Sequence, residues 1–271
     1  GLEGLRKMGL KPVVAPHVFK KDFIFAGTID QRLQSFLWAC RQKNVKAIWC
    51  VRGGYGAYAV AQELAKLKVP KAPAKLLIGF SDVTALGMVL TQKWKWPWLH
   101  AGMIHRMGIK VPKIERETLR GILFEKDYRL KINKGLKTLG RKAVAQGALT
   151  GGSLTLCATS LGSLWEIDTR GKILFLEEVG ERCYRLDRLL TQLKSAGKFD
   201  GVKAVVFGDF SECFELDKKQ RWPELLKRHF AKAKFPVIYG VRAGHADDLQ
   251  MPILMGYKVK VATKGKPTLE F

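Results

Sequence analysis

Short apolar runs alternate with amphipathic segments through the first third of the chain. The apolar side chains of residues 30–43 recur at the spacing of one helix face, which predicts an amphipathic helix. Apolar runs at 45–51 and 75–80 are typical of short buried strands, and helical patterns follow them at 57–67 and 82–91. Strands that alternate with helices in this way predict a parallel sheet flanked by helices.

A second pattern begins after residues 106–142, which are basic and only weakly periodic. Beyond them the sequence predicts strands at 172–179, 202–207 and 235–240, helices at 186–196 and 223–233, and a hairpin within 251–271. We therefore predict an α/β fold with two domains. Its parts are a parallel-sheet α/β domain at 1–125, a linker at 126–146, and a smaller, β-rich α+β domain at 147–271.

Charge is the unusual feature of the composition. The 271 residues include 48 lysines and arginines against 24 aspartates and glutamates, which gives a net charge of +24. That excess favours nucleic acid or another polyanion as a partner. However, residues 106–142, 218–234 and 256–271 supply 17 of the 24 excess charges, and no nucleic-acid-binding motif is present. A solvated basic surface is the simpler interpretation, and a polyanion-binding protein stays an alternative.

The cysteines give no sign of a bound metal. Five is an odd number, and no two of them have the C-x-x-C spacing of zinc or redox motifs. We therefore predict no metal and no cofactor. No apolar run approaches the ~18 residues of a membrane span, so none is predicted. The sequence begins at Gly1 without a signal-peptide core, although an exported chain whose signal had been removed would look the same.

Ser81 is the candidate nucleophile. It stands in the run Gly79-Phe80-Ser81-Asp82, where the second predicted strand leads directly into a helix. A sharp turn of this kind lifts a serine oxygen out of the sheet and leaves the following N–H, that of Asp82, free to stabilise an oxyanion. A plain N-cap serine would fit the same place, so both interpretations stay open.

The loop Arg52-Gly53-Gly54-Tyr55-Gly56 follows the neighbouring predicted strand. Its glycines allow a close approach of the backbone, which can provide a second oxyanion donor or a phosphate cradle. A simple tight turn would use the same residues. The spacing fits neither a P-loop nor a dinucleotide-binding motif, so a nucleotide site is unsupported.

A serine nucleophile needs a base and an acidic partner for that base. Among the five histidines, His100 and His245 are the contenders, and His245 lies in a loop after a predicted strand, where binding loops belong. Glu177 and Glu178 end an apolar strand, which is an unusual place for carboxylates. Only one of them can face a given cleft because successive side chains alternate. Two solvent-facing glutamates are the alternative.

These motifs, in this order, resemble the LD-carboxypeptidases, which are serine peptidases of bacterial murein recycling and include the microcin C immunity peptidases. The likeness covers essentially the whole chain and rests on Arg52–Gly56, Gly79–Leu86, Leu174–Val179, Tyr184–Arg188 and Gly244–His245. The family usually has a β-strand ahead of the helix at which this sequence begins. The sequence also departs from the family pattern at Ala59, Ala101–Gly102 and Ser153.

The resemblance implies a catalytic triad divided between two domains, with the active site at their interface. It matches Ser81 to the family's serine, Glu177 to its glutamate and His245 to its histidine. It also implies an oxyanion hole formed by the backbone N–H groups of Asp82 and Gly54. The remaining predicted substrate contacts are Arg52, Gly53, Tyr55 and His100, the last of which matches a family histidine whose role stays open.

The activity implied by the resemblance is removal of the terminal D-alanine from a murein tetrapeptide through an acyl-enzyme. The expected partner is a murein peptide, with no specific nucleic acid. An alternative within the family is hydrolysis of a peptidyl-nucleotide antibiotic. The likeness further leads us to expect a homodimer in the cytoplasm, with the periplasm as the alternative compartment.

Overall fold

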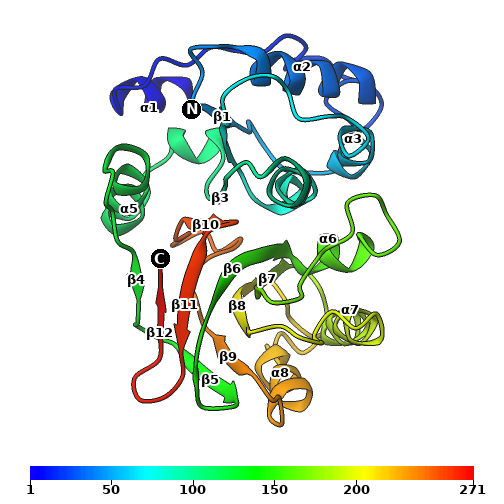
Figure 1. The fold of residues 1–271 in the computed structure, drawn as a ribbon, viewed down its shortest axis with the longest axis vertical. Helices are drawn as coiled ribbons and strands as arrows, with labels where there is room; N and C mark the ends of the chain where they lie inside the picture. Colours follow the sequence, from blue (N-terminus) through cyan, green and yellow to red (C-terminus); the bar gives the residue numbers. More distant parts are fainter.

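The N-terminal part of the computed structural model, which describes residues 1–271, is built on a four-stranded sheet (Figure 1). Three of its strands run parallel in the order β1 (Ala47–Trp49), β2 (Leu76–Ile78) and β3 (Trp98–His100). The fourth, β10 (Ile253–Met255), comes from the far end of the chain and pairs antiparallel with β3. The predicted parallel sheet is confirmed, and β10 is an addition that the sequence did not indicate.

Helices cover both faces of this sheet. They are α1 (Leu2–Lys7), α2 (Ile29–Arg41), α3 (Ala57–Leu64), α4 (Thr84–Val89) and α5 (Lys113–Phe124). Alternation along β2 explains the two layers, because Leu77 joins the core that contains α2, α3 and α4, whereas Ile78 packs with Leu119 of α5. Helices α2, α3 and α4 fall within or beside the predicted helical ranges, and α5 was not predicted.

The C-terminal part contains an eight-stranded sheet. Four parallel strands form its centre, in the order β6 (Val144–Ser153), β7 (Ile173–Val179), β8 (Ala204–Ser211) and β9 (Pro236–Tyr239). Antiparallel strands extend both edges: β11 (Lys258–Ala262), β12 (Thr268–Glu270) and β4 (Lys131–Ile132) beyond β6, and β5 (Lys137–Gly140) beyond β9. The helices of this part are α6 (Leu154–Thr159), α7 (Cys183–Ser195) and α8 (Trp222–Phe230).

The prediction of a linker at residues 126–146 is wrong. That segment contains β4, β5 and the beginning of β6, all of which belong to the C-terminal sheet. Its outward-facing basic residues and its glycines hid the strand pattern, because neither contributes to an apolar alternation. The C-terminal part is rich in strands, as predicted, with eight in its sheet against four in the N-terminal sheet.

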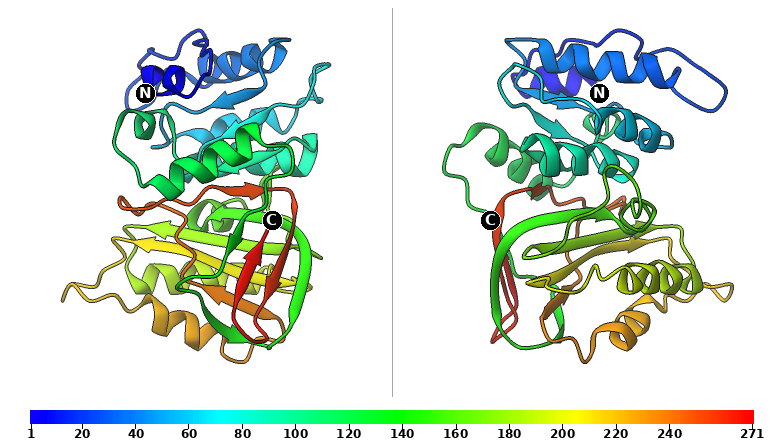
Figure 2. Two further views of the ribbon diagram at one scale, coloured as in Figure 1. Left: turned by 90° about the vertical axis from the view of Figure 1, so that its left-hand side faces the viewer. Right: turned by 45° about the vertical axis from the view of Figure 1, so that its right-hand side comes forward.

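The two parts share one hydrophobic core. A single cluster of 53 buried residues includes Leu77 and Met88 from the first part and Phe175 and Phe207 from the second. Figure 2 shows the two sheets one above the other, with β10 at their boundary. The relative placement of the parts is therefore fixed by buried packing and by strand pairing across the boundary.

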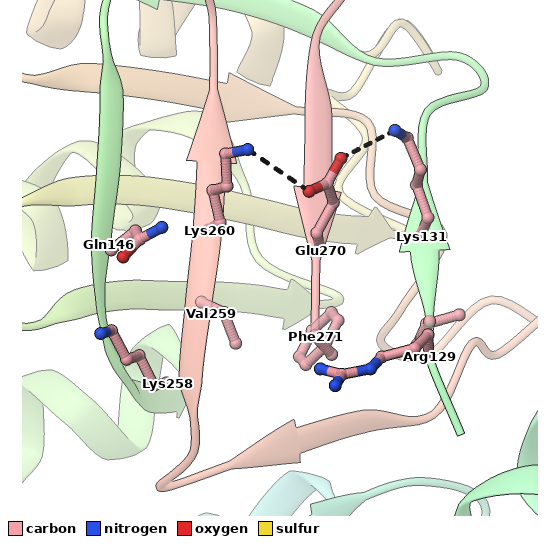
Figure 3. A pocket seen from close by; sticks show the side chains of 9 residues that line it. Arg129, Lys131, Gln146, Lys258, Val259, Lys260, Glu270 and Phe271 are labelled. Atoms are coloured by element: carbon pink, nitrogen blue, oxygen red, sulfur yellow. Dashed lines mark ion pairs between the residues drawn. The ribbon is translucent and has the colours of Figure 1, made fainter. Parts of the chain in front are cut away.

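Part of the excess positive charge lies on the outer face of the C-terminal sheet. Along β11, Lys258 and Lys260 point outward while Val259 and Val261 are buried. Figure 3 shows these lysines around a hollow of about 520 Å³, where Glu270 pairs with Lys131 at 2.8 Å and with Lys260 at 3.7 Å. This solvent-facing arrangement is the one expected for a solvated basic surface.

All five cysteines are free thiols, and three of them are buried. No set of three or more His, Cys, Asp and Glu side chains is arranged to hold a metal ion. None of the helices combines the length and the apolar character that crossing a membrane requires.

Candidate active site

Ser81 lies on a strained turn at the end of β2. Its φ of 63° puts it in the left-handed region, which is uncommon for a residue other than glycine. Ser81 begins a 3₁₀ turn over Ser81–Val83, which leads into α4. Strain of this kind persists only where the surrounding structure holds it, and it is a recurrent feature of serine nucleophiles at strand-to-helix turns.

The glycine loop packs directly against this serine. A Cβ built on Gly53 would lie 3.1 Å from Cβ and 3.4 Å from Oγ of Ser81, so a side chain there would crowd the hydroxyl. The Asp82 carboxylate fixes the loop from the other side, because its Oδ2 accepts the N–H of Ala57 at 2.5 Å. Asp82 therefore caps the N-terminus of α3 and holds the loop against Ser81.

Two backbone N–H groups beside Ser81 are unused. Neither Asp82 nor Gly54 donates a backbone hydrogen bond within the protein. Gly54 has a φ of 89°, which turns the backbone into a conformation that glycine adopts without strain. The two predicted oxyanion donors are therefore free for an acceptor from outside the protein.

Glu177, on a strand of the C-terminal sheet, and His245, in a loop that follows another of its strands, form a hydrogen-bonded pair. Glu177 lies on β7 with no solvent exposure, and its Oε2 lies 2.7 Å from Nδ1 of His245. His245 follows Gly244 in the loop between β9 and β10. Gly244 leaves room for the pair, since a Cβ there would lie 2.9 Å from Glu177 Oε2. With Nδ1 bound to Glu177, Nε2 is the nitrogen left to take a proton.

The pair shifts the protonation of both partners. Burial alone would raise the pKa of Glu177, but the charges and hydrogen bonds of His245 and His100 outweigh it and lower the pKa to about 2. Burial would lower the pKa of His245, but the charge and hydrogen bond of Glu177 outweigh it and raise the pKa. Glu177 is consequently an ionised carboxylate at neutral pH, the form that accepts a hydrogen bond from His245.

Phe80 connects the pair to the serine. It precedes Ser81 in the chain, and its ring meets the ring of His245 edge-on with centroids 4.7 Å apart. His245 makes no hydrogen bond to Ser81 in the structure, a contact that commonly tightens only when substrate is bound. The structure thus brings the three predicted triad residues to one place, with the Glu–His bond formed and the Ser–His bond not formed.

His100 lies beneath the site and not at its surface. It is only 2% exposed, and its Nε2 lies 3.4 Å from Oε1 of Glu177. Because Glu177 is ionised, this ring nitrogen must be the donor. The rings of Trp98, Phe80 and Phe175 surround His100, with centroids 5.2 to 5.8 Å away. This position does not support the predicted substrate contact; it suits a residue that holds the carboxylate.

The other predicted substrate contacts lie on the exposed side of the glycine loop. Arg52 is exposed, and Tyr55 is 70% exposed and stacks on Phe25 at 5.7 Å between centroids. Their contacts with a substrate stay predictions. Phe25 was missed by the sequence reasoning because it lies in an N-terminal segment without a clear period, and only the fold places it beside the loop.

Glu178 and Asp209 are two further buried or half-buried carboxylates near the pair. Glu178 accepts the N–H groups of Thr155 at 2.7 Å and Val179 at 3.0 Å, and burial followed by the charge of Glu177 raises its pKa to about 6. Burial likewise raises the pKa of Asp209 to about 6, against the opposing charge of Arg242. Alternation along β7 explains why Glu177, and not Glu178, meets the histidine.

A serine on a strained turn, two free N–H groups beside it and a histidine fixed by a buried carboxylate are the components of a serine hydrolase site. The chain belongs to the LD-carboxypeptidase family. Residues 1–101 match the LD-carboxypeptidase N-terminal domain, and residues 146–261 match the LD-carboxypeptidase C-terminal domain. The family shown by these matches makes the protein a peptidase-type hydrolase.

Individual relatives agree with this assignment. The chain is 37% identical over 262 residues to a Rickettsia conorii protein that carries a carboxypeptidase name, which covers 93% of this chain and 80% of that protein. It is 29% identical over 251 residues to the murein tetrapeptide carboxypeptidase of Pseudomonas aeruginosa, with coverages of 90% and 81%. Its fold matches that of MccF in complex with glutamyl sulfamoyl guanosine, with a TM-score of 0.84 at 22% identity over 99% of this chain and 88% of that one.

Proposed function

We propose that the protein is a serine carboxypeptidase that removes the terminal D-alanine from murein tetrapeptides. The observation that carries this proposal is the 2.7 Å bond between His245 and the buried Glu177, formed beside the strained Ser81 turn. The substrate class comes from the family and from relatives such as the murein tetrapeptide carboxypeptidase of Pseudomonas aeruginosa.

In the first half of the reaction, Ser81 Oγ attacks the carbonyl carbon of the bond that precedes D-alanine. His245 Nε2 takes the serine proton, and Glu177 stabilises the resulting imidazolium. The N–H groups of Asp82 and Gly54 donate to the developing oxyanion. The carbon–nitrogen bond then breaks, the proton passes from His245 to the leaving amine, and D-alanine departs.

In the second half, water attacks the acyl-enzyme. His245 takes a proton from the water, the ester bond to Ser81 breaks, and the proton returns to the serine oxygen. The shortened peptide leaves with a new carboxylate. Such peptides carry several carboxylates, so the positive charge of the chain favours their approach.

The test is release of D-alanine from a free murein tetrapeptide by the wild type, Ser81→Ala and Ser195→Ala. Ser195 ends α7 and is exposed, so its variant is a matched serine-to-alanine control. We expect turnover in the wild type and in Ser195→Ala, and no turnover in Ser81→Ala with an unchanged circular dichroism spectrum. Retained turnover in Ser81→Ala refutes the assignment.

A second candidate function is hydrolysis of a peptidyl-nucleotide. One observation favours it: Tyr55 offers an exposed aromatic ring, supported by Phe25, on the loop that packs against Ser81. A nucleobase can stack on such a ring. Assays of the same enzyme preparation with a murein tetrapeptide and with an aminoacyl sulfamoyl nucleoside separate the two. A higher kcat/KM for the nucleoside, lost in Tyr55→Ala, supports this candidate.

A further inference from the structure

A buried ion pair of the N-terminal part holds the loop that carries His245. Arg106 and Glu115 are each 4% exposed in their side chains, and they form a two-pronged pair, Nε to Oε1 at 2.6 Å and Nη2 to Oε2 at 2.8 Å. The geometry is that of a strong, charge-assisted bidentate contact. Arg106 lies in the turn after β3, and Glu115 lies in the first turn of α5.

The remaining hydrogen-bonding capacity of this pair goes to the backbone of the His245 loop. Arg106 Nη1 and Nη2 both donate to the carbonyl of Asp247 at 3.2 Å. Glu115 Oε2 accepts the N–H of Gln250 at 2.9 Å. The Asp247 carbonyl thus binds the arginine of the ion pair, and the Gln250 N–H binds its glutamate. Asp247 is only two residues from His245.

The other contacts of the loop are internal or go to the C-terminal part, apart from the ring contact between Phe80 and His245. The loop runs from β9 to β10 without helix or strand, so its backbone groups need partners elsewhere. Within the loop, Arg242 pairs with Asp248, and the N–H of Met251 donates to the carbonyl of Arg242. The Arg106–Glu115 pair supplies the hydrogen bonds that this loop receives from the N-terminal part, which also carries Ser81.

We propose that Arg106 and Glu115 are positioning residues that set His245 relative to Ser81 by binding the backbone of residues 247–250. This inference rests on the roles proposed above for Ser81 and His245. A misplacement of about 1 Å between reacting groups costs about 10²-fold in rate. Loss of the anchor is therefore expected to lower kcat, while substrate contacts made by the glycine loop keep KM nearly unchanged.

The decisive variant is Arg106→Met/Glu115→Leu, which replaces the pair with apolar side chains of similar size. Replacement of a buried ion pair in this way is often neutral for stability, whereas removal of one partner leaves an unpaired buried charge. We expect a folded protein with a somewhat lower midpoint of thermal unfolding, because the Asp247 carbonyl and the Gln250 N–H lose their partners. We also expect faster hydrogen exchange at the Gln250 amide and a fall of about 10²-fold in kcat. Labelling of Ser81 by a fluorophosphonate should slow by a similar factor.

The matched control is Lys131→Gln/Glu270→Gln, which removes a partly exposed ion pair on the outer face of the C-terminal sheet (Figure 3). We expect it to change neither kcat nor the labelling rate. Wild-type kcat and labelling in Arg106→Met/Glu115→Leu overturn the proposal. If that variant does not fold, Arg106→Lys keeps the charge and loses the fork; a kcat equal to that of the wild type then overturns it.

Failure of the proposed function gives a different result. A wild type that leaves the tetrapeptide uncut but is labelled at Ser81 refutes the substrate, and the labelling rates still decide the anchor. Hydrogen exchange at Gln250 requires neither substrate nor nucleophile. If that amide is as protected in Arg106→Met/Glu115→Leu as in the wild type, the anchor is refuted whatever the enzyme cleaves.

Discussion

Replacement of Glu177 by glutamine tests the electrostatic core of the proposed mechanism. The substitution keeps the size of the side chain and removes its charge. In the wild type Oε2 of Glu177 bonds to Nδ1 of His245, and in the variant the amide NH2 group can take the place of that oxygen. In the wild type, the pKa of Glu177 is lowered from 4.5 to about 2, although burial alone would raise it. A change of this size corresponds to about 3 kcal/mol of net stabilisation of the carboxylate.

We expect kcat for Glu177→Gln to fall by at least about 10²-fold, because the carboxylate charge that stabilises the imidazolium in the transition state is lost. If the amide also reverses the tautomer of His245, the fall approaches the ~10⁴-fold known for the equivalent change in a serine protease triad. The assay is D-alanine release under saturating tetrapeptide, with Glu178→Gln as the control. Glu178 is the adjacent buried carboxylate, and its bonds go to backbone N–H groups and not to the histidine.

The pH dependence of kcat/KM is a second, independent test of the role of the Glu177 charge. His245 acts as a base only when neutral, so kcat/KM of the wild type falls as the pH drops through the pKa of His245. Burial would lower that pKa, but Glu177 raises it above the ordinary value of about 6.5. Without the carboxylate, burial dominates, and the acid limb of Glu177→Gln moves to lower pH. An acid limb that stays in place, or a kcat within threefold of that of Glu178→Gln, refutes the reasoning.

Two further substitutions probe the surroundings of the same carboxylate. His100→Phe removes the donor to Glu177 Oε1 and keeps an aromatic ring. Because the lost bond is long at 3.4 Å, we expect a loss of about tenfold in kcat at constant KM. Steady-state kinetics measure this loss, and we expect partial recovery of kcat in His100→Gln. Gly244→Ala places a methyl group 2.9 Å from Glu177 Oε2, at a backbone φ of 147°. We expect the variant to fold but to lose both the His245–Glu177 hydrogen bond and turnover. NMR of the His245 Nδ1 proton checks the bond, and circular dichroism checks the fold. A normal kcat in either variant contradicts the role given to Glu177.

The candidate residues at the ends of strands could be predicted from the sequence. Ser81 and Glu177 both stand at the ends of apolar runs, which is a pattern visible without a structure, and β2 and β7 lie where those runs predict them. His245 follows a glycine after another such run. Parallel strands present their carboxyl ends to the same edge of a sheet, which makes Glu177 and His245 candidates for one site, whereas Ser81 follows a strand of the other sheet and is brought to them only by the fold.

The supports of the site could not be predicted in the same way. His100, Arg106 and Glu115 act through partners that lie 77, 141 and 135 residues away in the chain, and no local period encodes such contacts. Arg106 and Glu115 also stand in the basic segment 106–142, where the charges favour an exposed surface. Only the fold shows that this arginine and this glutamate are buried.

The division of the site between the two parts explains why their junction is so extensively packed. Ser81, the two proposed oxyanion donors and the supports His100 and Arg106 come from the first part, whereas Glu177 and His245 come from the second. A shift between the parts would therefore change the Ser81–His245 distance directly. The continuous core, the pairing of β10 with β3 and the Arg106–Glu115 anchor all oppose such a shift. We infer that the interface is part of the catalytic machinery, because it fixes a distance that neither part can set alone.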